Sequence, residues 1–294
     1  MSLHVDADPS NDDQAARAAW LYYVGGLTQD QIAAEMGVSR QRAQRLVSRA
    51  IAAGLVRCRV MPWLGAERDP VLTISAAAAA EMERVLRERD PLVVAVGTGR
   101  AMRGMVEALG VIEAPQHRLV SLIGNIAPDG SASYFDVIMR LGEKVRAPHY
   151  PMPVPVVSAT AEENAAFQSL GPVSKVRELA RAADVSFVGV GQMSDDAPLF
   201  ADGFLSAEEL HEVQKEGAVG EVAGWIFNSE GRYLDLALNQ RLGGVRVDTT
   251  SPERPVIGVA AGPSKVLPIT AALRSGILNG LVTDELTARG ILAG

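Results

Sequence analysis

The amino-acid sequence predicts an α/β protein that begins with a small all-α segment and continues as a large domain with a mostly parallel sheet. Three observations support this fold class. Apolar strand-like runs alternate with helical segments beyond residue 90, short glycine-containing connections join them, and three short helices with caps and glycine stops precede residue 55. Such alternation is typical of a Rossmann-like sheet covered by helices on both faces.

The elements of the large domain follow one another along the chain. The alanine run 76–80 predicts a helix ahead of the first strand. The apolar runs 91–97, 118–124 and 185–191 are interpreted as strands, and a segment that ends at Leu109 and residues 135–145 are interpreted as helices. The alternation continues through 206–217, 220–228, 254–262, 264–276 and 279–292.

Start and stop signals divide the chain into four segments. Residues 1–13 are polar and acidic and are expected to form a flexible tail, and residues 14–61 contain the short helices. Alternating apolar and arginine residues at 55–61 predict a strand that gives this segment a winged-like end. Residues 62–70 are predicted to be a linker, and 71–294 to be the large domain.

The short helices have the arrangement of a helix-turn-helix. Thr28 can cap a helix that starts at Gln29, Gly37 supplies a tight turn, and Ser39 can cap a third helix over 40–53. Val38, Leu46 and Val47 are expected to face inward. The candidate DNA contacts are then polar residues at the start of the second helix, at the cap of the third helix and on the outer face of the third helix: Thr28, Gln29, Ser39, Arg40, Gln41, Arg42, Gln44 and Arg45.

Charge is segregated in a way that suits this interpretation. The whole chain has a net charge of -7, yet residues 14–60 contain seven arginines against Asp30 and Glu35. Arginine can bind guanine and glutamine can bind adenine through two hydrogen bonds each. The alternative is that an arginine-rich helix is only a solvated face. The helix caps, the glycine turn, the basic helix and the arginine-containing strand occur together within a short segment. This combination favours double-stranded DNA as a partner.

The composition excludes several other classes. Hydrophobic residues make up 48% and charged residues 21%, which is ordinary for a folded globular chain. The single cysteine, Cys58, excludes an internal disulfide, and four scattered histidines offer no metal-ligand spacing. His117, His149 and His211 are expected on the surface or in loops. Without an apolar leader or membrane span, a cytoplasmic protein with no cofactor, metal or membrane partner is expected.

Four stretches, in order, resemble one known family. Residues 20–60 resemble the N-terminal module of the SorC family of sugar-binding transcription regulators, and residues 97–100, 217–231 and 256–288 resemble stretches of that family's effector domain. The resemblance implies an effector domain related to sugar-phosphate isomerases and glucosamine-phosphate deaminases. It also implies a homo-oligomer, dimeric or tetrameric, whose operator binding is controlled by a sugar, polyol or sugar phosphate. Glu221 and Ala261 stand where the family often has aspartate and glycine.

Effector-binding candidates lie at strand ends of the large domain. Gly97, Thr98, Gly99 and Arg100 join an apolar strand to a helix, whose backbone amides can hold a phosphate; a tight turn without a ligand is the alternative. Glu221 and Lys265 supply a carboxylate for hydroxyls and an ammonium for an anion, or are surface charges.

Two further candidates and one cap come from positions next to strands. Asn125 ends a strand and Asp136 starts the helix that follows, where open α/β sheets bind ligands. For Thr283 or Asp284 a helix N-cap is the simplest role.

Two functions follow from these observations. One is a DNA-binding transcription regulator of a carbohydrate-utilisation operon. The other is a sugar-phosphate isomerase, deaminase or kinase-like enzyme with an N-terminal interaction module. The enzyme needs a general base near the sugar carbons, and no His, Asp and Glu grouping supplies a convincing acid-base set. The sequence therefore favours the regulator.

Overall fold

A computed structural model describes residues 11–23, 27–52, 57–61, 70–132, 137–248 and 250–293. Contacts between Cα atoms divide the chain into two compact units. One unit comprises Met1–Cys58 with Arg289–Gly294, and the other comprises Arg59–Ala288. The predicted linker, apart from Pro70, lies outside the described residues.

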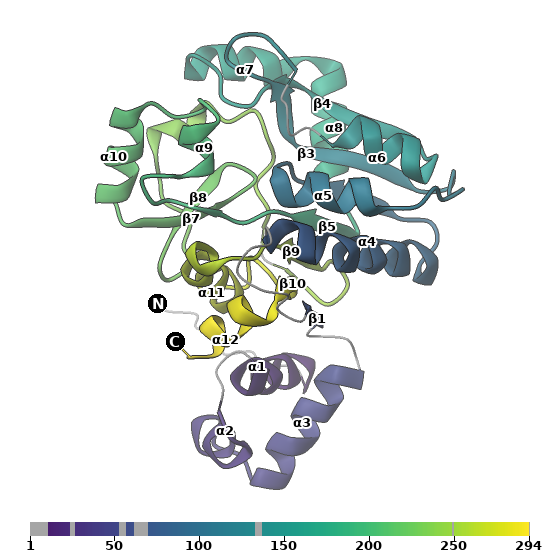
Figure 1. Ribbon diagram of the computed structural model, residues 1–294, viewed down its shortest axis with the longest axis vertical. Coiled ribbons are helices and arrows are strands. Elements are labelled where there is room, and N and C mark those ends of the chain that lie inside the picture. The colour runs from purple at the N-terminus through teal and green to yellow at the C-terminus, as the bar shows by residue number, and fades with distance from the viewer. Residues whose placement is uncertain are drawn as a thin grey trace, which may run out of the picture. The chain divides into compact units, whose positions relative to one another are not determined.

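Three helices form the first unit: α1 (Asn11–Tyr23), α2 (Gln29–Glu35) and α3 (Arg40–Ala52) (Figure 1). α1 begins inside the segment predicted as a tail, because a polar, acidic stretch suits the first turn of a helix as well as it suits a tail. Small and aliphatic side chains of the three helices form one core: Ala15, Ala18, Ala19, Leu21, Ile32, Ala43, Leu46, Val47 and Ala50. Val38 is half-buried beside it.

The turns of this unit form as predicted. Thr28 and Gln31 make a reciprocal capping box at the start of α2, and Gly37 has φ +63° between α2 and α3. Only glycine adopts that conformation without a steric cost, so the turn depends on it. α3 therefore leaves α2 at a fixed angle, with its arginine-rich side away from the core.

A seven-stranded sheet has the order β1-β10-β9-β5-β2-β3-β4. All the strand pairs from β10 to β4 are parallel, which confirms the predicted mostly parallel α/β fold. The strands are β1 (Arg57–Met61), β2 (Val93–Val96), β3 (Arg118–Ile126), β4 (His149–Pro155), β5 (Val185–Val188), β9 (Val256–Val259) and β10 (Gly280–Asp284).

Helices cover both faces of this sheet. α4 (Pro70–Glu88), α5 (Arg100–Ala108) and α6 (Ile138–Val145) share one buried apolar cluster with alternate residues of the strands, such as Val94 and Val96. They lie in front of the sheet in Figure 1. α8 (Gly171–Arg181) packs against β2, β3 and β4, and none of its residues belongs to that cluster, so it covers the other face.

The remaining helices complete the layers. They are α7 (Ala161–Ser169), α9 (Pro198–Ala201), α10 (Ala207–Lys215), α11 (Val266–Arg274) and α12 (Glu285–Ala293), with the 3-10 turns η1 (Ala237–Gln240) and η2 (Pro263–Lys265). The carboxylate of Asp284 accepts a hydrogen bond from the Thr287 amide at 2.7 Å, which confirms the predicted N-cap. No helix in the described ranges has the length and hydropathy that a membrane crossing requires.

One predicted part of the parallel sheet lies elsewhere. Residues 220–228 belong to a separate antiparallel sheet with the order β6 (Gly191–Gln192), β7 (Ala218–Val222) and β8 (Trp225–Asn228). The reason is the two-residue turn between β7 and β8, where Ala223 and Gly224 have φ +53° and +85°. Positive φ at both central residues matches the twist of a tight hairpin, and a two-residue loop is too short for a parallel crossover.

His117 lies in the loop before β3, as predicted, but it is not an ordinary loop residue. Its side chain is fully buried, and its two ring nitrogens bond to the Leu92 amide at 3.1 Å and the Leu86 carbonyl at 3.0 Å. The imidazole thus joins the end of α4 to the start of β2, and a histidine in a loop-like sequence carries no local signal for that role. His211 is exposed on α10, as predicted, but the prediction for His149 was wrong: it lies half-buried in β4, because it pairs with Leu119 of β3.

Replacing His117 with alanine is expected to lower the free energy of unfolding by about 2–4 kcal/mol, because a donor and an acceptor lose their buried partner and a cavity remains. Urea denaturation followed by circular dichroism measures this change. His211→Ala, at an exposed site, is the control and should leave the unfolding midpoint unchanged. Equal midpoints for the two variants would contradict the bridging role of His117.

Candidate functional site

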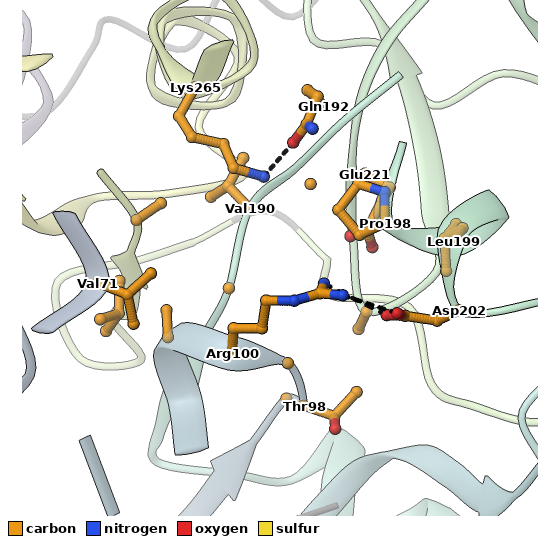
Figure 2. Close-up of a pocket in the computed structure, with 18 of the residues that line it drawn as sticks. Val71, Thr98, Arg100, Val190, Gln192, Pro198, Leu199, Asp202, Glu221 and Lys265 are labelled. Atoms are coloured by element: carbon orange, nitrogen blue, oxygen red, sulfur yellow. Dashed lines mark hydrogen bonds and ion pairs between the residues drawn. The ribbon is translucent and has the colours of Figure 1, made fainter. Parts of the chain in front are cut away.

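The direction of strand order reverses between β2 and β5. From β2 the sheet extends through β3 and β4, and the chain then returns to β5 on the other side of β2 and extends through β9 and β10. A crevice forms at the carboxyl ends of two such strands because their connections leave in opposite directions. A cavity of about 340 Å³ lies there, between the loops 97–101, 189–192 and 259–261 and the segment 196–204 (Figure 2).

The loop after β2 brings backbone close to the cavity. Gly99 has φ +111° and immediately precedes α5, and the Gly97 amide donates to the Phe187 carbonyl at 2.8 Å, which ties the loop to β5. The first amides of a helix have no partner within it, and its N-terminus is partly positive. Arg100 and Ala101, the first residues of α5, line the cavity, so this helix end can hold an anion there.

An ion pair spans the cavity between two elements. A terminal nitrogen of Arg100 lies 2.8 Å from an Asp202 carboxylate oxygen, as Figure 2 shows. Asp202 directly follows the short helix α9, whose segment also supplies Leu199 and Phe204 to the lining. The Arg100 side chain is half-exposed, so the pair is only weakly stabilising, by less than about 1 kcal/mol, and can be exchanged for another anion at little cost.

The opposite wall carries a buried charge cluster. The Lys265 ammonium donates a hydrogen bond to the Gln192 side-chain oxygen (Figure 2), and Glu221 accepts one from the Gly224 amide at 2.8 Å. A Cβ at Gly191 would lie 2.2 Å from a Glu221 carboxylate oxygen, so glycine there makes room for the carboxylate. The three strands of the small sheet thereby hold Glu221 against the cavity.

Burial changes the acid-base properties of this cluster. It lowers the pKa of Lys265 to about 8, although the nearby carboxylates of Glu221 and Asp196 act in the opposite direction. Burial also raises the pKa of the Glu221 carboxyl above its usual range. By contrast, hydrogen bonds from Ser194 and Gln192 hold the pKa of Asp196 low. Lys265 therefore loses its proton at a lower pH than an ordinary lysine, Glu221 keeps its proton to a higher pH than an ordinary glutamate, and Asp196 remains a carboxylate that can accept hydroxyl hydrogens.

A basic surface lies on the first unit. Of the eight candidate DNA contacts, Gln29 is half-buried and the others are exposed. Ser39 accepts the Arg42 amide at 3.3 Å, as a cap of α3 should, and the Arg42 guanidinium also donates to Gln14 at 3.0 Å. Arg40 lies 3.5 Å from Asp30, and both side chains are about two-thirds exposed, so solvent weakens this pair. These arginines can exchange their present contacts for phosphates or bases.

Comparison with known proteins identifies the family. Residues 36–293 match a family model described as "Putative sugar-binding domain". The chain is 33% identical to the erythritol catabolism regulatory protein EryD of Brucella abortus, over 98% of both proteins. The chain belongs to the SorC family of sugar-binding transcription regulators. It is also 31% identical to the transcriptional regulator LsrR of Klebsiella pneumoniae, over 97% of this chain and 94% of the relative.

Solved structures have the same fold. The full-length sorbitol operon regulator SorC from Klebsiella pneumoniae superposes with a TM-score of 0.71 at 21% identity, over 96% of this chain and 99% of that one. A DeoR family transcriptional regulator from Listeria monocytogenes gives a TM-score of 0.73 at 18% identity, over 83% of this chain and 97% of that one. Because its close relatives are regulators, this SorC-family chain is a DNA-binding transcription regulator and not an enzyme, as predicted.

The cavity brings together six of the eight predicted effector-binding residues. The predicted residues in its lining are Gly97, Thr98, Gly99, Arg100, Glu221 and Lys265. Asn125 is half-buried within β3 and is not among the described lining residues, because β3 continues past the level at which β2 ends. Asp136 lies outside the described residues.

Three polar lining residues were not predicted. Gln192, Asp196 and Asp202 follow the carboxyl end of β5, beside the predicted loop after β2. The order of strands in a sheet cannot be derived from one sequence, so nothing indicated that these two loops are neighbours. The glycine-rich end of β5 followed by paired aspartates at 195–196 was the available signal.

Direct titration of Lys265 tests the description of the cluster. Carbon-13 methylation followed by NMR is expected to give a pKa of about 8 in the ligand-free protein. Glu221→Gln should lower this pKa further, because a nearby carboxylate stabilises the ammonium, and Arg100→Gln should raise it, because a nearby cation is removed. A wild-type pKa at the ordinary value of 10.5 would show that the ammonium is solvated.

Proposed function

We propose that this regulator controls a carbohydrate-utilisation operon and that its effector binds in the cavity between β2 and β5. The single observation that carries the proposal is the combination of an anion-binding helix end, two cations and three carboxylates around one space of about 340 Å³. That volume lies at the lower end of the range typical of small-molecule pockets, about 300–1,000 Å³. Two relatives named for erythritol catabolism and for the sorbitol operon support an effector of polyol size.

The charged groups of the cavity suit two different parts of a ligand. The α5 N-terminus, Arg100 and Lys265 suit an anionic group, and a phosphate fits the loop 97–99 because its amides and the positive helix end act together. Glu221, Asp196 and Asp202 suit hydroxyl groups, which donate to carboxylates. A sugar phosphate or polyol phosphate uses both sets, whereas an uncharged sugar or polyol uses mainly the carboxylates.

Effector binding is coupled to DNA binding through two arrangements of a homo-oligomer. An effector changes the equilibrium only as far as its affinities for the two arrangements differ. An anionic effector competes with Asp202 for Arg100, so it releases the α9 segment that the ion pair holds. Paired first units, in a dimer or tetramer, then bind operator half-sites in the cytoplasm with altered spacing.

α3 reads the operator in this proposal. Arg40, Gln41, Arg42, Gln44 and Arg45 lie on its outer face, and caps at Thr28 and Ser39 put amides and hydroxyls near the backbone phosphates. Two such heads linked in one oligomer bind more tightly than one head, because the second binding event is intramolecular.

A thermal-shift screen tests the effector site. Erythritol, sorbitol, other sugars and their phosphates are the probes, and a true effector at 100 times its Kd stabilises the folded state by about 2.7 kcal/mol, a rise of several degrees in Tm. Thr98→Ala and Lys265→Ala are expected to abolish the shift caused by a phosphorylated ligand. The exposed Lys215→Ala is the matched control and should keep it. Equal shifts in all three variants would place the ligand elsewhere.

Salt dependence tests the DNA-binding surface. Replacing Arg40, Arg42 and Arg45 together with glutamine should abolish specific binding to a palindromic site from the regulated promoter. It should also reduce the slope of log Kd against log salt by about 0.9 for each phosphate that the variant no longer neutralises. Fluorescence anisotropy measures both effects, with Arg118→Gln in the second unit as control. An unchanged slope in the triple variant would contradict the role of α3.

A further inference from the structure

A second cavity lies away from the proposed effector site. It has a volume of about 240 Å³ and is lined by the C-terminal end of α8, by the starts of β5 and β9, and by the loop that leads into β9. The effector cavity is at the carboxyl ends of the parallel strands, whereas Ser186 and Val256 of the second cavity are at or next to the first residues of β5 and β9. The two spaces share no described lining residue.

Three arginines, Arg181, Arg246 and Arg254, are among the residues that line this second cavity. Arg254 is held in place by hydrogen bonds from its side chain to the Ala183 carbonyl, at 3.0 Å, and to the Arg181 carbonyl. A guanidinium has five N–H donors, and these two bonds leave others for a ligand. Its position is thus fixed before any ligand binds, which reduces the entropic cost of binding.

Arg246 is fixed in a different way. Its guanidinium carbon lies 5.8 Å from the centre of the Trp225 ring and 5.3 Å from that of Tyr233. Stacking on aromatic faces uses the plane of the guanidinium and leaves its N–H edge available. The Asp248 carboxylate lies 3.4 Å from the guanidinium and is 76% exposed, so this ion pair is weak and solvated.

Two polar groups of the cavity have no partner at present. The Ser186 side chain is only 8% exposed, and within the described part of the chain its hydroxyl makes no hydrogen bond. The Arg181 guanidinium likewise has no hydrogen-bond or ion-pair partner among the described residues. The Ser186 hydroxyl and the exposed Arg181 side chain are therefore available to donate hydrogen bonds to an acceptor in the cavity.

The charge of the cavity defines the ligand class. The described lining residues include three arginines and one acidic residue, Asp248, in a chain whose net charge is -7, so the acidic body has a locally positive hollow here. A dianion with several acceptor oxygens matches both the charge and the donors, and arginine binds phosphoryl groups through paired hydrogen bonds. We propose that the cavity formed by Arg181, Arg246, Arg254 and Ser186 is a second anion site that binds a phosphoryl group, as free phosphate or as a phosphomonoester.

The hairpin of β7 and β8 connects the second site to the effector cavity. Trp225, on which Arg246 stacks, is the first residue of β8 and pairs with Val222 of β7, the neighbour of Glu221. Occupation of the second site thus acts on the strand that carries an effector-cavity carboxylate. The proposal for the second site does not depend on the effector assignment.

Calorimetric titration with inorganic phosphate tests the proposal on the full-length chain. Lys265→Ala is the background, because it impairs anion binding in the effector cavity. In this background one phosphate per chain is expected to bind. Adding Arg181→Gln should weaken binding at least about tenfold, since a hydrogen bond to a charged group is lost. Ser186→Ala should weaken it several-fold, and Arg118→Gln should not change it.

The outcomes separate this site from the effector site and from an interface. Absence of phosphate binding in the Lys265→Ala background, or equal weakening by Arg118→Gln, would overturn the second site without affecting the effector proposal. Analytical ultracentrifugation of Arg181→Gln is the companion measurement. Dissociation of the oligomer together with unchanged phosphate affinity would show that the arginines bind another copy of the chain, and would also overturn the proposal. A glucose 6-phosphate titration distinguishes phosphomonoester from free phosphate as the preferred ligand.

Discussion

The adjacency of β2 and β5 is the constraint on which the proposed effector site depends. Because the two strands are hydrogen-bonded neighbours whose connections leave in opposite directions, their following loops separate and leave a space. The glycines at 97, 99, 189 and 191 allow backbone to approach this space from both sides. The small antiparallel sheet then begins directly at Gly191, so the loop after β5 both lines the cavity and positions Glu221.

Both cations of that cavity already have polar partners in the ligand-free protein. Arg100 is paired with Asp202, and Lys265 is bonded to Gln192 near the Glu221 and Asp196 carboxylates. An effector therefore exchanges interactions more than it creates them. Selectivity then depends on the difference between the interactions that a ligand makes and those that it replaces.

The parts of this protein that the sequence predicts are those with local causes. Thr28, Gly37 and Ser39 are caps and turns, and they form where predicted because their effect extends over three or four residues. The glycine loop before Arg100 was predicted for the same reason. Gln192, Asp202 and the buried His117 were missed, because their roles depend on which strands become neighbours. The hairpin at 220–228 was misplaced because β-propensity does not say which sheet a strand joins.

The close packing of Gly191 against Glu221 limits how this regulator can acquire a new specificity. Any side chain at 191 collides with the carboxylate, so a drift in sequence at that position would displace Glu221 and disturb the small sheet. In the segment 196–204, Ala197 and Leu199 belong to a buried apolar cluster, but the ion pair between Asp202 and the half-exposed Arg100 imposes no comparable steric limit on the cavity side. Divergence among related sensors, and laboratory evolution of biosensors from this scaffold, should therefore concentrate in that segment while the glycine loops stay unchanged.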